Sequence, residues 1–266
     1  INLKKKDNVI MPAINFVASF NVCKLLDANI YLADVDPLTG QMTPETLMRC
    51  IKNNNIKNIK AVVLMYLGGA ANDNYEFYKL KKKYDFFIIE DACHALGAKI
   101  KSNKKTKYVG SCFYTDICVF SFHPLKSITS GEGGAVVTNN KKFSNTIKLA
   151  RSHGINYKKN HWEYDVDFSS LNFRISEVNC ALVYSQLFSL KKFIDKRKEI
   201  ANLYKKEFNI LKKHIRVCNK NPETAWHLFQ IQINFKSLKQ KSIFFRFMKS
   251  KKIFSQNHYI PIYRFK

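Results

Sequence analysis

A lysine and a carboxylate follow two apolar stretches that are predicted to be neighbouring strands. Asp91 ends the strand predicted over residues 86–91, and Lys126 comes shortly after the strand predicted over residues 117–122. In open α/β sheets, ligands bind at the carboxyl ends of the strands. There, a lysine amine can form a Schiff base with an aldehyde, and a carboxylate can keep a pyridine nitrogen protonated so that the ring accepts electrons. This pair of residues therefore suggests pyridoxal phosphate as the cofactor.

Spacing alone leaves a plainer interpretation open. Lysine and aspartate are common, and such a pair is more often a solvated loop lysine and an aspartate that caps a helix. Gly131, Gly133 and Gly134 follow Lys126, but their spacing matches neither a dinucleotide-binding fingerprint nor a P-loop. We expect these glycines to let the backbone pass closely behind Lys126.

The elements that must position these residues alternate between strand and helix signals. Apolar runs predict strands over residues 29–35, 59–66, 86–91, 117–122 and 134–138. Helices are predicted to begin at Thr43, which is an N-cap followed by a proline, and at Asn72. Continuous apolar strands separated by amphipathic helices indicate a mostly parallel sheet that is covered on both faces.

The pattern changes near Ser176, a candidate helix cap. One long helix is predicted from there to about Phe208, followed by a strand over 226–233, a basic helix around 243–252 and a short strand through His258. We therefore expect a large domain over residues 1–175 and a smaller α+β domain over residues 176–266.

Composition narrows the possible partners. The chain has 266 residues, 46% of them hydrophobic, so it can bury a sizeable core, and no apolar run is long enough to cross a membrane. The net charge of +25 is spread over separate helical segments, and no nucleic-acid-binding motif accompanies it. The seven cysteines and seven histidines show no disulfide or metal-ligand spacing. We expect a cytoplasmic protein with no metal site, no nucleic-acid partner and no membrane association.

Several short motifs occur in order along the chain. They are Glu90–Ala98, Ser121–Lys126, Thr129–Thr138, Arg151–Ile155, Asn172–Arg174 and His258–Ile262. Together they resemble the DegT/DnrJ/EryC1/StrS family of pyridoxal-phosphate-dependent aminotransferases, which act on nucleotide-linked keto sugars. The resemblance implies an aspartate-aminotransferase-like fold (fold type I), with a large α/β domain built on a mixed, mostly parallel sheet and a smaller C-terminal α+β domain.

The resemblance also implies roles for residues around the cofactor. Lys126 corresponds to the Schiff-base lysine and Asp91 to the partner of the pyridine nitrogen. His94 takes the place of the residue near the phenolic oxygen, Ser121 contacts the phosphate, and Phe16 stacks on the ring. Without the resemblance, Phe16 is equally well an ordinary core aromatic and His94 a buried histidine with satisfied hydrogen bonds.

Two further segments are implied to complete the site. Asn172 resembles the asparagine that reaches the cofactor phosphate of the neighbouring subunit, which implies a homodimer with shared active sites; on its own it reads as a turn residue. His258, Tyr259, Ile260 and Pro261 resemble the segment that lines the sugar-nucleotide site. Family members carry a Gly-Thr-Ala type segment ahead of the region where this sequence starts, so we expect a fragment of a longer enzyme that lacks both ends.

The implied reaction moves an amino group from an amino acid, expected to be glutamate, to a nucleotide-linked keto sugar. The segment from Trp162 to Tyr164 is similar to members that aminate C4 of UDP-linked 4-keto-6-deoxy-N-acetylhexosamines on the way to pseudaminic acid. Two alternatives stay open. One is a sugar dehydratase on the same scaffold, although such dehydratases carry histidine in place of Lys126. The other is a non-catalytic relative that binds the cofactor.

Overall fold

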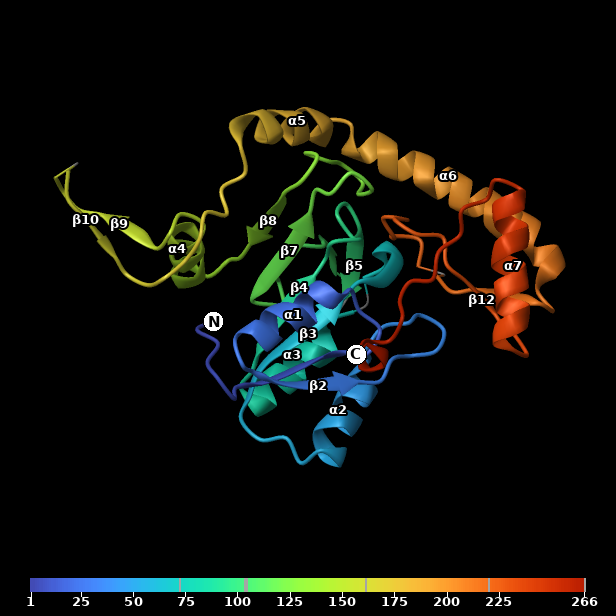
Figure 1. Ribbon diagram of the computed structural model, residues 1–266, viewed down its shortest axis with the longest axis horizontal. Helices are drawn as coiled ribbons and strands as arrows, with labels where there is room; N and C mark the ends of the chain where they lie inside the picture. Colours follow the sequence, from blue (N-terminus) through green and yellow to red (C-terminus); the bar gives the residue numbers. More distant parts are fainter. Residues whose placement is uncertain (72, 103–104, 161, 220, 266) are drawn as a thin grey trace.

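A six-stranded sheet forms the centre of the molecule, which is known here from a computed structural model (Figure 1). The structure describes residues 1–266 except 72, 103–104, 161, 220 and 266. The strand order is β2-β1-β3-β4-β7-β8, and only β8 runs antiparallel to its neighbour. The strands are β1 (Asn8–Pro12), β2 (Asn29–Ala33), β3 (Ile59–Met65), β4 (Phe87–Asp91), β7 (Ile117–Ser121) and β8 (Gly134–Val137). The predicted mixed, mostly parallel sheet is confirmed.

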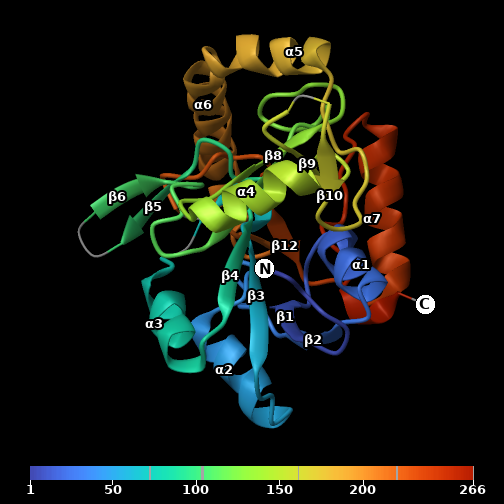
Figure 2. The same cartoon turned by 90° about the vertical axis from the view of Figure 1, so that its left-hand side faces the viewer.

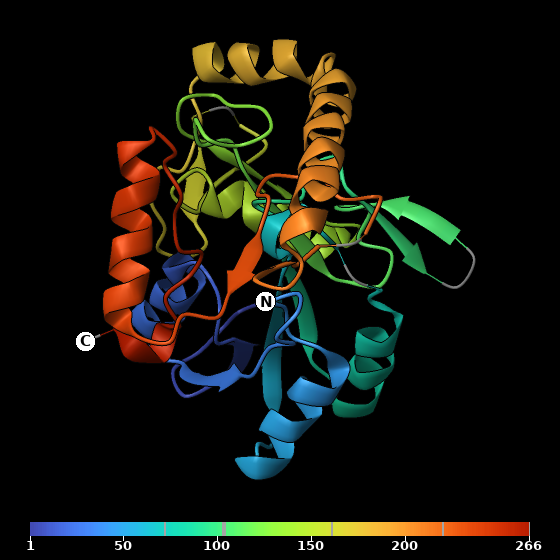
Figure 3. The same cartoon turned by 90° about the vertical axis from the view of Figure 1, so that its right-hand side faces the viewer.

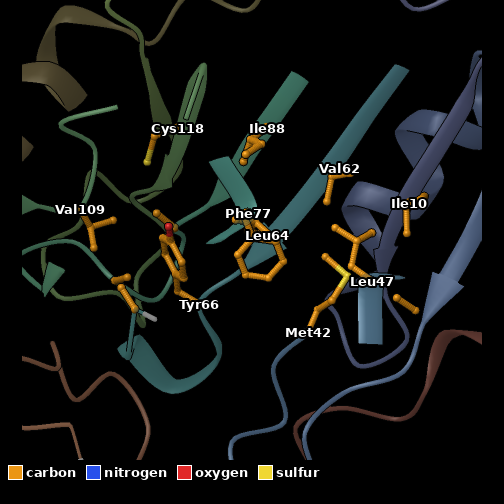
Figure 4. Close-up of a cluster of buried hydrophobic side chains, with 14 of the residues drawn as sticks. Ile10, Met42, Leu47, Val62, Leu64, Tyr66, Phe77, Ile88, Val109 and Cys118 are labelled. Atoms are coloured by element: carbon orange, nitrogen blue, oxygen red, sulfur yellow. The ribbon is translucent and has the colours of Figure 1, made fainter. Parts of the chain in front are cut away.

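Helices cover both faces of this sheet. Successive strand residues point to opposite faces, and the side chains on both faces are apolar. On one face, Ile10 and Val62 pack with Leu47 of α2 (Pro44–Asn53) and Phe77 of α3 (Tyr75–Tyr84), as Figure 4 shows. On the other face, Val9, Met11, Ala61 and Val63 pack with Cys23 of α1 (Val17–Leu25). Each fully buried aliphatic side chain contributes about 1.5–3 kcal/mol to stability. The sheet is therefore a rigid platform for the residues at its carboxyl edge.

The remaining elements extend from this platform. Two hairpins project from the body of the molecule: β5 (Lys99–Ser102) with β6 (Lys105–Tyr108), and β9 (Ile155–Tyr157) with β10 (Tyr164–Val166) (Figures 1 and 2). The other helices are α4 (Lys141–Ala150), α5 (Glu177–Leu187), α6 (Leu190–Phe208) and α7 (Leu238–Ser250). The last two strands, β11 (Ile215–Val217) and β12 (Ile231–Ile233), form a small antiparallel pair. Three 3-10 turns, η1 (Leu67–Gly69), η2 (Asn209–Leu211) and η3 (Ile262–Arg264), complete the described elements. Within the described residues, no helix combines the length and apolar character that crossing a bilayer requires.

The single long helix predicted from Ser176 to Phe208 is wrong in one respect. Ser176 does cap the first turn, because its hydroxyl accepts a hydrogen bond from the Asn179 N–H at 3.2 Å. The helix then breaks at residues 188–189, and α6 sets off at a steep angle to α5 (Figure 3). The side chain of Gln186 bonds the backbone of Thr129, which ties the end of α5 to the large sheet. The helix breaks directly after Gln186 and Leu187, where this link to the sheet is made.

The strand predicted over 226–233 is much shorter than expected, since only Ile231–Ile233 pairs with a neighbour. The residues before it hydrogen-bond to the η1 turn instead: Ala225 N–H donates to Gly69 O at 3.0 Å and Leu228 N–H to Gly68 O at 3.2 Å. The short strand predicted through His258 is absent, and that segment is irregular. The helix predicted from Asn72 begins at Tyr75, and residue 72 lies outside the described residues.

Candidate active site

Lys126 lies in a tight turn after β7. The turn is closed by a hydrogen bond from the Lys126 N–H to His123 O at 2.9 Å, and Gln186 holds the following loop at Thr129. Burial lowers the pKa of Lys126 below its ordinary value, while the neighbouring Cys93 and Asp91 act in the opposite direction. A lysine with a lowered pKa offers more unprotonated amine at neutral pH, which is the form that attacks an aldehyde.

Asp91 ends β4, the strand next to β7, and it pairs in register with Val119. Its Oδ2 accepts a hydrogen bond from the Ser19 hydroxyl at 3.2 Å, and its Oδ1 accepts one from the Cys93 N–H at 3.3 Å. Ser19 belongs to α1, so the carboxylate is held from two sides. Asp91 and Lys126 lie close together at one edge of the sheet, since the Asp91 carboxylate contributes to the electrostatic surroundings of Lys126.

His94 is the most buried of the predicted site residues, at 3% exposure. Its Nδ1 accepts a hydrogen bond from the Gly68 N–H at 3.3 Å, and its Nε2 lies 3.0 Å from the Tyr259 hydroxyl oxygen. Burial, together with the positive surroundings of His227, Lys126 and His258, lowers the pKa of His94 to about 2. This imidazole is therefore neutral at every physiological pH.

The C-terminal part of the chain supplies a second group of side chains to the site, beside those of the sheet. The His227 ring lies 4.3 Å from the His94 ring, between centroids, and burial followed by Lys126 and Arg197 lowers the pKa of His227 to about 3. Burial and Lys126 also lower the pKa of His258. The segment that carries His258 and Tyr259 is fixed to the sheet, because the Ile262 N–H donates to Ala13 O at 2.9 Å.

Phe16 and Ser121 flank this group. The Phe16 ring lies 5.8 Å from that of Tyr259 and is 52% exposed, so a ligand has access to it. Phe16 is thus no ordinary core aromatic in this chain. Ser121 ends β7, and its hydroxyl accepts a hydrogen bond from the His123 N–H at 3.3 Å.

Other predicted residues lie outside this cluster of described side chains. Asn172 is exposed on the connection between β10 and α5, where its Oδ1 accepts a hydrogen bond from the Arg174 N–H at 3.0 Å and its backbone bridges to Ser152. Ile260 is exposed and Pro261 half-buried, at the end of the anchored segment. The roles that the resemblance implies for these three residues stay predictions.

Sequence reasoning missed Ser19, Gly68 and His227. Ser19 lies in the first turn of α1, three residues after the N-cap residue Phe16, so it is close in sequence to a predicted site residue. Gly68 and His227 carried no such signal. Their place at the site depends on the contact between the η1 turn and residues 225–228, which are far apart in the sequence.

The donor set fits the pyridoxal phosphate that the sequence suggested. Lys126 offers an amine for the aldehyde, and Asp91 offers a supported carboxylate for the pyridine nitrogen. Phe16 presents an accessible ring, and Ser121 presents a hydroxyl at the end of the adjacent strand. No residue at this strand edge contradicts that chemistry in the part of the chain that the structure describes.

Comparisons with known proteins agree with this chemistry. The profile described as the DegT/DnrJ/EryC1/StrS aminotransferase family matches residues 1–266. The UDP-4-amino-4,6-dideoxy-N-acetyl-beta-L-altrosamine transaminase of Campylobacter jejuni subsp. jejuni serotype O:23/36 (strain 81-176) is 37% identical over 265 residues, covering 98% of this chain and 67% of that protein. The GDP-perosamine synthase of Escherichia coli O157:H7 is 33% identical over 211 residues, covering 79% of this chain and 54% of that protein.

Solved structures show the same relationship. Helicobacter pylori PseC, described as an aminotransferase involved in the biosynthesis of pseudoaminic acid, is 30% identical with a TM-score of 0.89, over 100% of this chain and 69% of that chain. The PLP form of the sugar aminotransferase Spr1654 from Streptococcus pneumoniae shares the fold, at 24% identity and a TM-score of 0.85, over 97% of this chain and 68% of that chain. The chain spans about two thirds of the length of the curated relatives that it matches over nearly all of its own length. It has the fold type I architecture of pyridoxal-phosphate enzymes, and it belongs to the DegT/DnrJ/EryC1/StrS aminotransferase family.

Proposed function

We propose that this protein transfers an amino group from an amino acid, with glutamate as the expected donor, to C4 of a UDP-linked 4-keto-6-deoxy-N-acetylhexosamine. One observation carries the proposal: the Lys126 amine and the supported Asp91 carboxylate lie together at the carboxyl edge of a fold type I sheet. The choice of sugar is supported by the similarity to the C. jejuni transaminase, which is named for that class of product.

Each residue of the group has a defined task in this proposal. Pyridoxal phosphate, when bound, supplies an aldehyde carbon and a ring that accepts electrons. Lys126 Nζ would hold the cofactor through its aldehyde carbon, and its free amine would be the base that moves the proton at the reacting carbon. The Asp91 carboxylate would bind the protonated pyridine nitrogen, and the Ser19 hydroxyl together with the Cys93 N–H fixes the direction of that carboxylate.

The other roles are proposed from the resemblance. Phe16 packs against the cofactor ring, Ser121 binds the phosphate, and His258, Tyr259, Ile260 and Pro261 line the sugar site. The role of His94 beside the phenolic oxygen stays a prediction, and both of its ring nitrogens already have partners in the structure.

We also propose a cytoplasmic homodimer, with Asn172 of each subunit completing the site of the other. Exposed apolar side chains on the elements that precede and follow Asn172 in the sequence support an interface there, because soluble proteins seldom leave large apolar surfaces uncovered. They include Tyr157, Tyr164, Phe173, Val178 and Leu182. All seven cysteines are free, which is consistent with a reducing compartment. We further propose that the large domain ends near residue 175, where the smaller C-terminal domain begins.

The function is tested on the full-length protein loaded with pyridoxal phosphate. Incubation with glutamate and the UDP-linked 4-keto sugar is expected to yield 2-oxoglutarate and a sugar nucleotide whose mass shows that nitrogen has replaced the keto oxygen. The Lys126→Ala variant serves as the inactive control. Loss of water from the sugar without nitrogen uptake identifies the dehydratase alternative. A cofactor-loaded protein that turns over no keto sugar identifies the non-catalytic one.

A further inference from the structure

Lys126 is the middle residue of a loop over residues 123–129, named here the Lys126 loop, on the connection from β7 to β8. The two ends of this loop meet at Phe122. The backbone oxygen of Phe122 accepts hydrogen bonds from the Ser130 N–H at 3.0 Å and from the Thr129 hydroxyl at 2.9 Å. The loop is therefore closed at its base, and the position of the lysine depends on how firmly that base is held.

Helix α5 holds the base of the loop through one side chain. Gln186 Oε1 accepts a hydrogen bond from the Thr129 N–H at 3.1 Å, and Gln186 Nε2 donates to Thr129 O at 2.7 Å. An amide side chain carries an acceptor and a donor side by side, which is what this pairing needs. Both backbone groups of Thr129 are thus bound to a single side chain from a distant part of the sequence.

Gln186 belongs to the one face of α5 that turns inward. Within α5, the less exposed residues are Asn179, Val183 and Gln186, which have the i, i+4, i+7 spacing of a single helical face. Asn179 Nδ2 also donates to Glu132 O, at 3.5 Å. Seven helical residues rise about 10.5 Å, and three residues of extended chain span about 10 Å. The chain from Thr129 to Glu132 therefore runs antiparallel to α5 and contacts it at both ends.

The place that the loop gives Lys126 affects the protonation of its amine. The amine is half-buried, and burial lowers its pKa, whereas Cys93 and Asp91 act in the opposite direction. The titratable groups that lie around it come from outside the loop; they are Asp91, Cys93 and His94 at the end of β4, and His227 and His258 from the C-terminal part. If the loop were to loosen, the amine would regain contact with water, and its pKa would rise towards the ordinary value.

We propose that Gln186 is a positioning residue for Lys126: by pairing with the backbone of Thr129, it holds the Lys126 loop so that the amine stays half-buried beside Asp91. Proton transfer needs the reacting atoms about 3–3.5 Å apart, and a displacement of about 1 Å is enough to slow it. A fixed loop base therefore matters for a lysine that moves a proton. This inference rests on the proposed function only in taking Lys126 as the residue that holds the cofactor.

The first test measures Lys126 without turnover. Full-length protein freed of its cofactor is labelled with acetic anhydride over a range of pH, and mass spectrometry follows the peptide that contains Lys126. The reagent acylates only the unprotonated amine, so the midpoint of the rate profile reports the pKa of Lys126, and the plateau reports its access to solvent. Gln186→Leu is expected to move the midpoint to higher pH and to raise the plateau.

A second variant and a control keep this test specific. Gln186→Asn retains the amide but is one methylene shorter, so it cannot reach both groups of Thr129 and is expected to shift the midpoint in the same direction. Gln240→Leu also removes a glutamine that makes a hydrogen bond, from the Lys236 N–H at 2.7 Å at the start of α7, and should leave the midpoint unchanged. An unchanged midpoint in both Gln186 variants, or an equal shift in Gln240→Leu, would overturn the proposal.

The second test uses single turnovers of the cofactor-loaded protein with glutamate. Gln186→Leu is expected to lower the maximal rate roughly tenfold and to leave the half-saturating glutamate concentration nearly unchanged, because the amine is displaced while substrate contacts remain. A raised half-saturating concentration at an unchanged maximal rate would contradict a positioning role. If the cofactor were found on another lysine, the proposed function would fail while the labelling result would stand, so the two failures are distinguishable.

Discussion

At the scale of single residues, the site depends on how its charges are supported. Asp91 has two hydrogen-bond donors, the Ser19 hydroxyl and the Cys93 N–H, which fix the direction of its carboxylate. Lys126 is half-buried, and burial lowers its pKa. The neighbouring histidines are neutral, so Asp91 is the negative group that faces Lys126 from the adjacent strand.

The first prediction concerns Asp91. Asp91→Asn should leave the fold intact, because an amide fills the same space, but the pyridine nitrogen loses its anionic partner. Stopped-flow measurement of the glutamate half-reaction is expected to show a rate lower by orders of magnitude. Asp85→Asn, at an exposed helix end, is the matched control and should react at the normal rate. Near-normal turnover in Asp91→Asn would remove this carboxylate from the mechanism.

The second prediction concerns acid stability. The pKa of His94 is about 2 in the folded protein and about 6.5 in the unfolded chain. Between these values the unfolded chain binds a proton that the folded protein does not, so the free energy of unfolding falls as the pH drops below 6.5. The loss between pH 7 and pH 5 amounts to about 2 kcal/mol from this group alone.

Urea unfolding of the cofactor-free protein at pH 7 and pH 5 measures this loss. His94→Gln, which does not titrate, should lose about 2 kcal/mol less than the wild type over this interval. His214→Gln removes an exposed histidine and should behave like the wild type. Equal losses in the wild type and in His94→Gln would show that His94 is protonated in the folded protein.

At the scale of elements, the η1 turn connects His94, which follows the sheet strand β4, with residues 225–228 of the C-terminal part. Its glycines accept hydrogen bonds from Ala225 and Leu228, and the Gly68 N–H reaches His94. Gly69 has a φ of +98°, and a Cβ there would lie 2.6 Å from the backbone oxygen of His94. Residues with a side chain rarely adopt that backbone conformation, and the backbone oxygen of His94 can move away only at a large cost in free energy.

The third prediction therefore compares two glycines. Gly69→Ala should lower the free energy of unfolding by about 2–4 kcal/mol, because it combines an unfavourable φ with a steric clash. Gly131→Ala has a similar φ of +81° but no atom within 4 Å of the new Cβ, so it should cost only about 1–2 kcal/mol. Thermal and urea unfolding of both variants measure the difference. Equal costs would mean that the packing around η1 is looser than the structure shows.

The elements also show which parts of the fold were predictable. The strands β3, β4 and β7 were predicted because their residues are apolar on both faces, a pattern that depends on local sequence alone. The break between α5 and α6 and the irregular segment before β12 were missed. Both result from distant hydrogen bonds, from Gln186 to Thr129 and from residues 225–228 to η1, and these outweigh local preference.

At the scale of the whole molecule, the site is assembled from both halves of the chain. The sheet contributes Lys126, Asp91 and His94, and the C-terminal part contributes His227 and the segment of His258 and Tyr259. Further backbone hydrogen bonds join the halves, including Lys99 N–H to Glu223 O at 2.9 Å. Motifs predicted the sheet residues and also His258 and Tyr259, because each motif is continuous in sequence. His227 was not predictable, since only the tertiary contact with η1 brings it beside His94.

The central claim is that Lys126, among all the lysines of this basic chain, holds the cofactor. Borohydride reduction of the full-length, cofactor-loaded protein, followed by digestion and mass spectrometry, tests it most directly. The reduced adduct is expected on the peptide that contains Lys126. Lys126→Ala should still bind the cofactor through Asp91 and its neighbours but give no adduct, whereas Lys141→Ala, on the exposed start of α4, should be labelled normally. An adduct on any other lysine, or an active Lys126→Ala variant, would contradict the account.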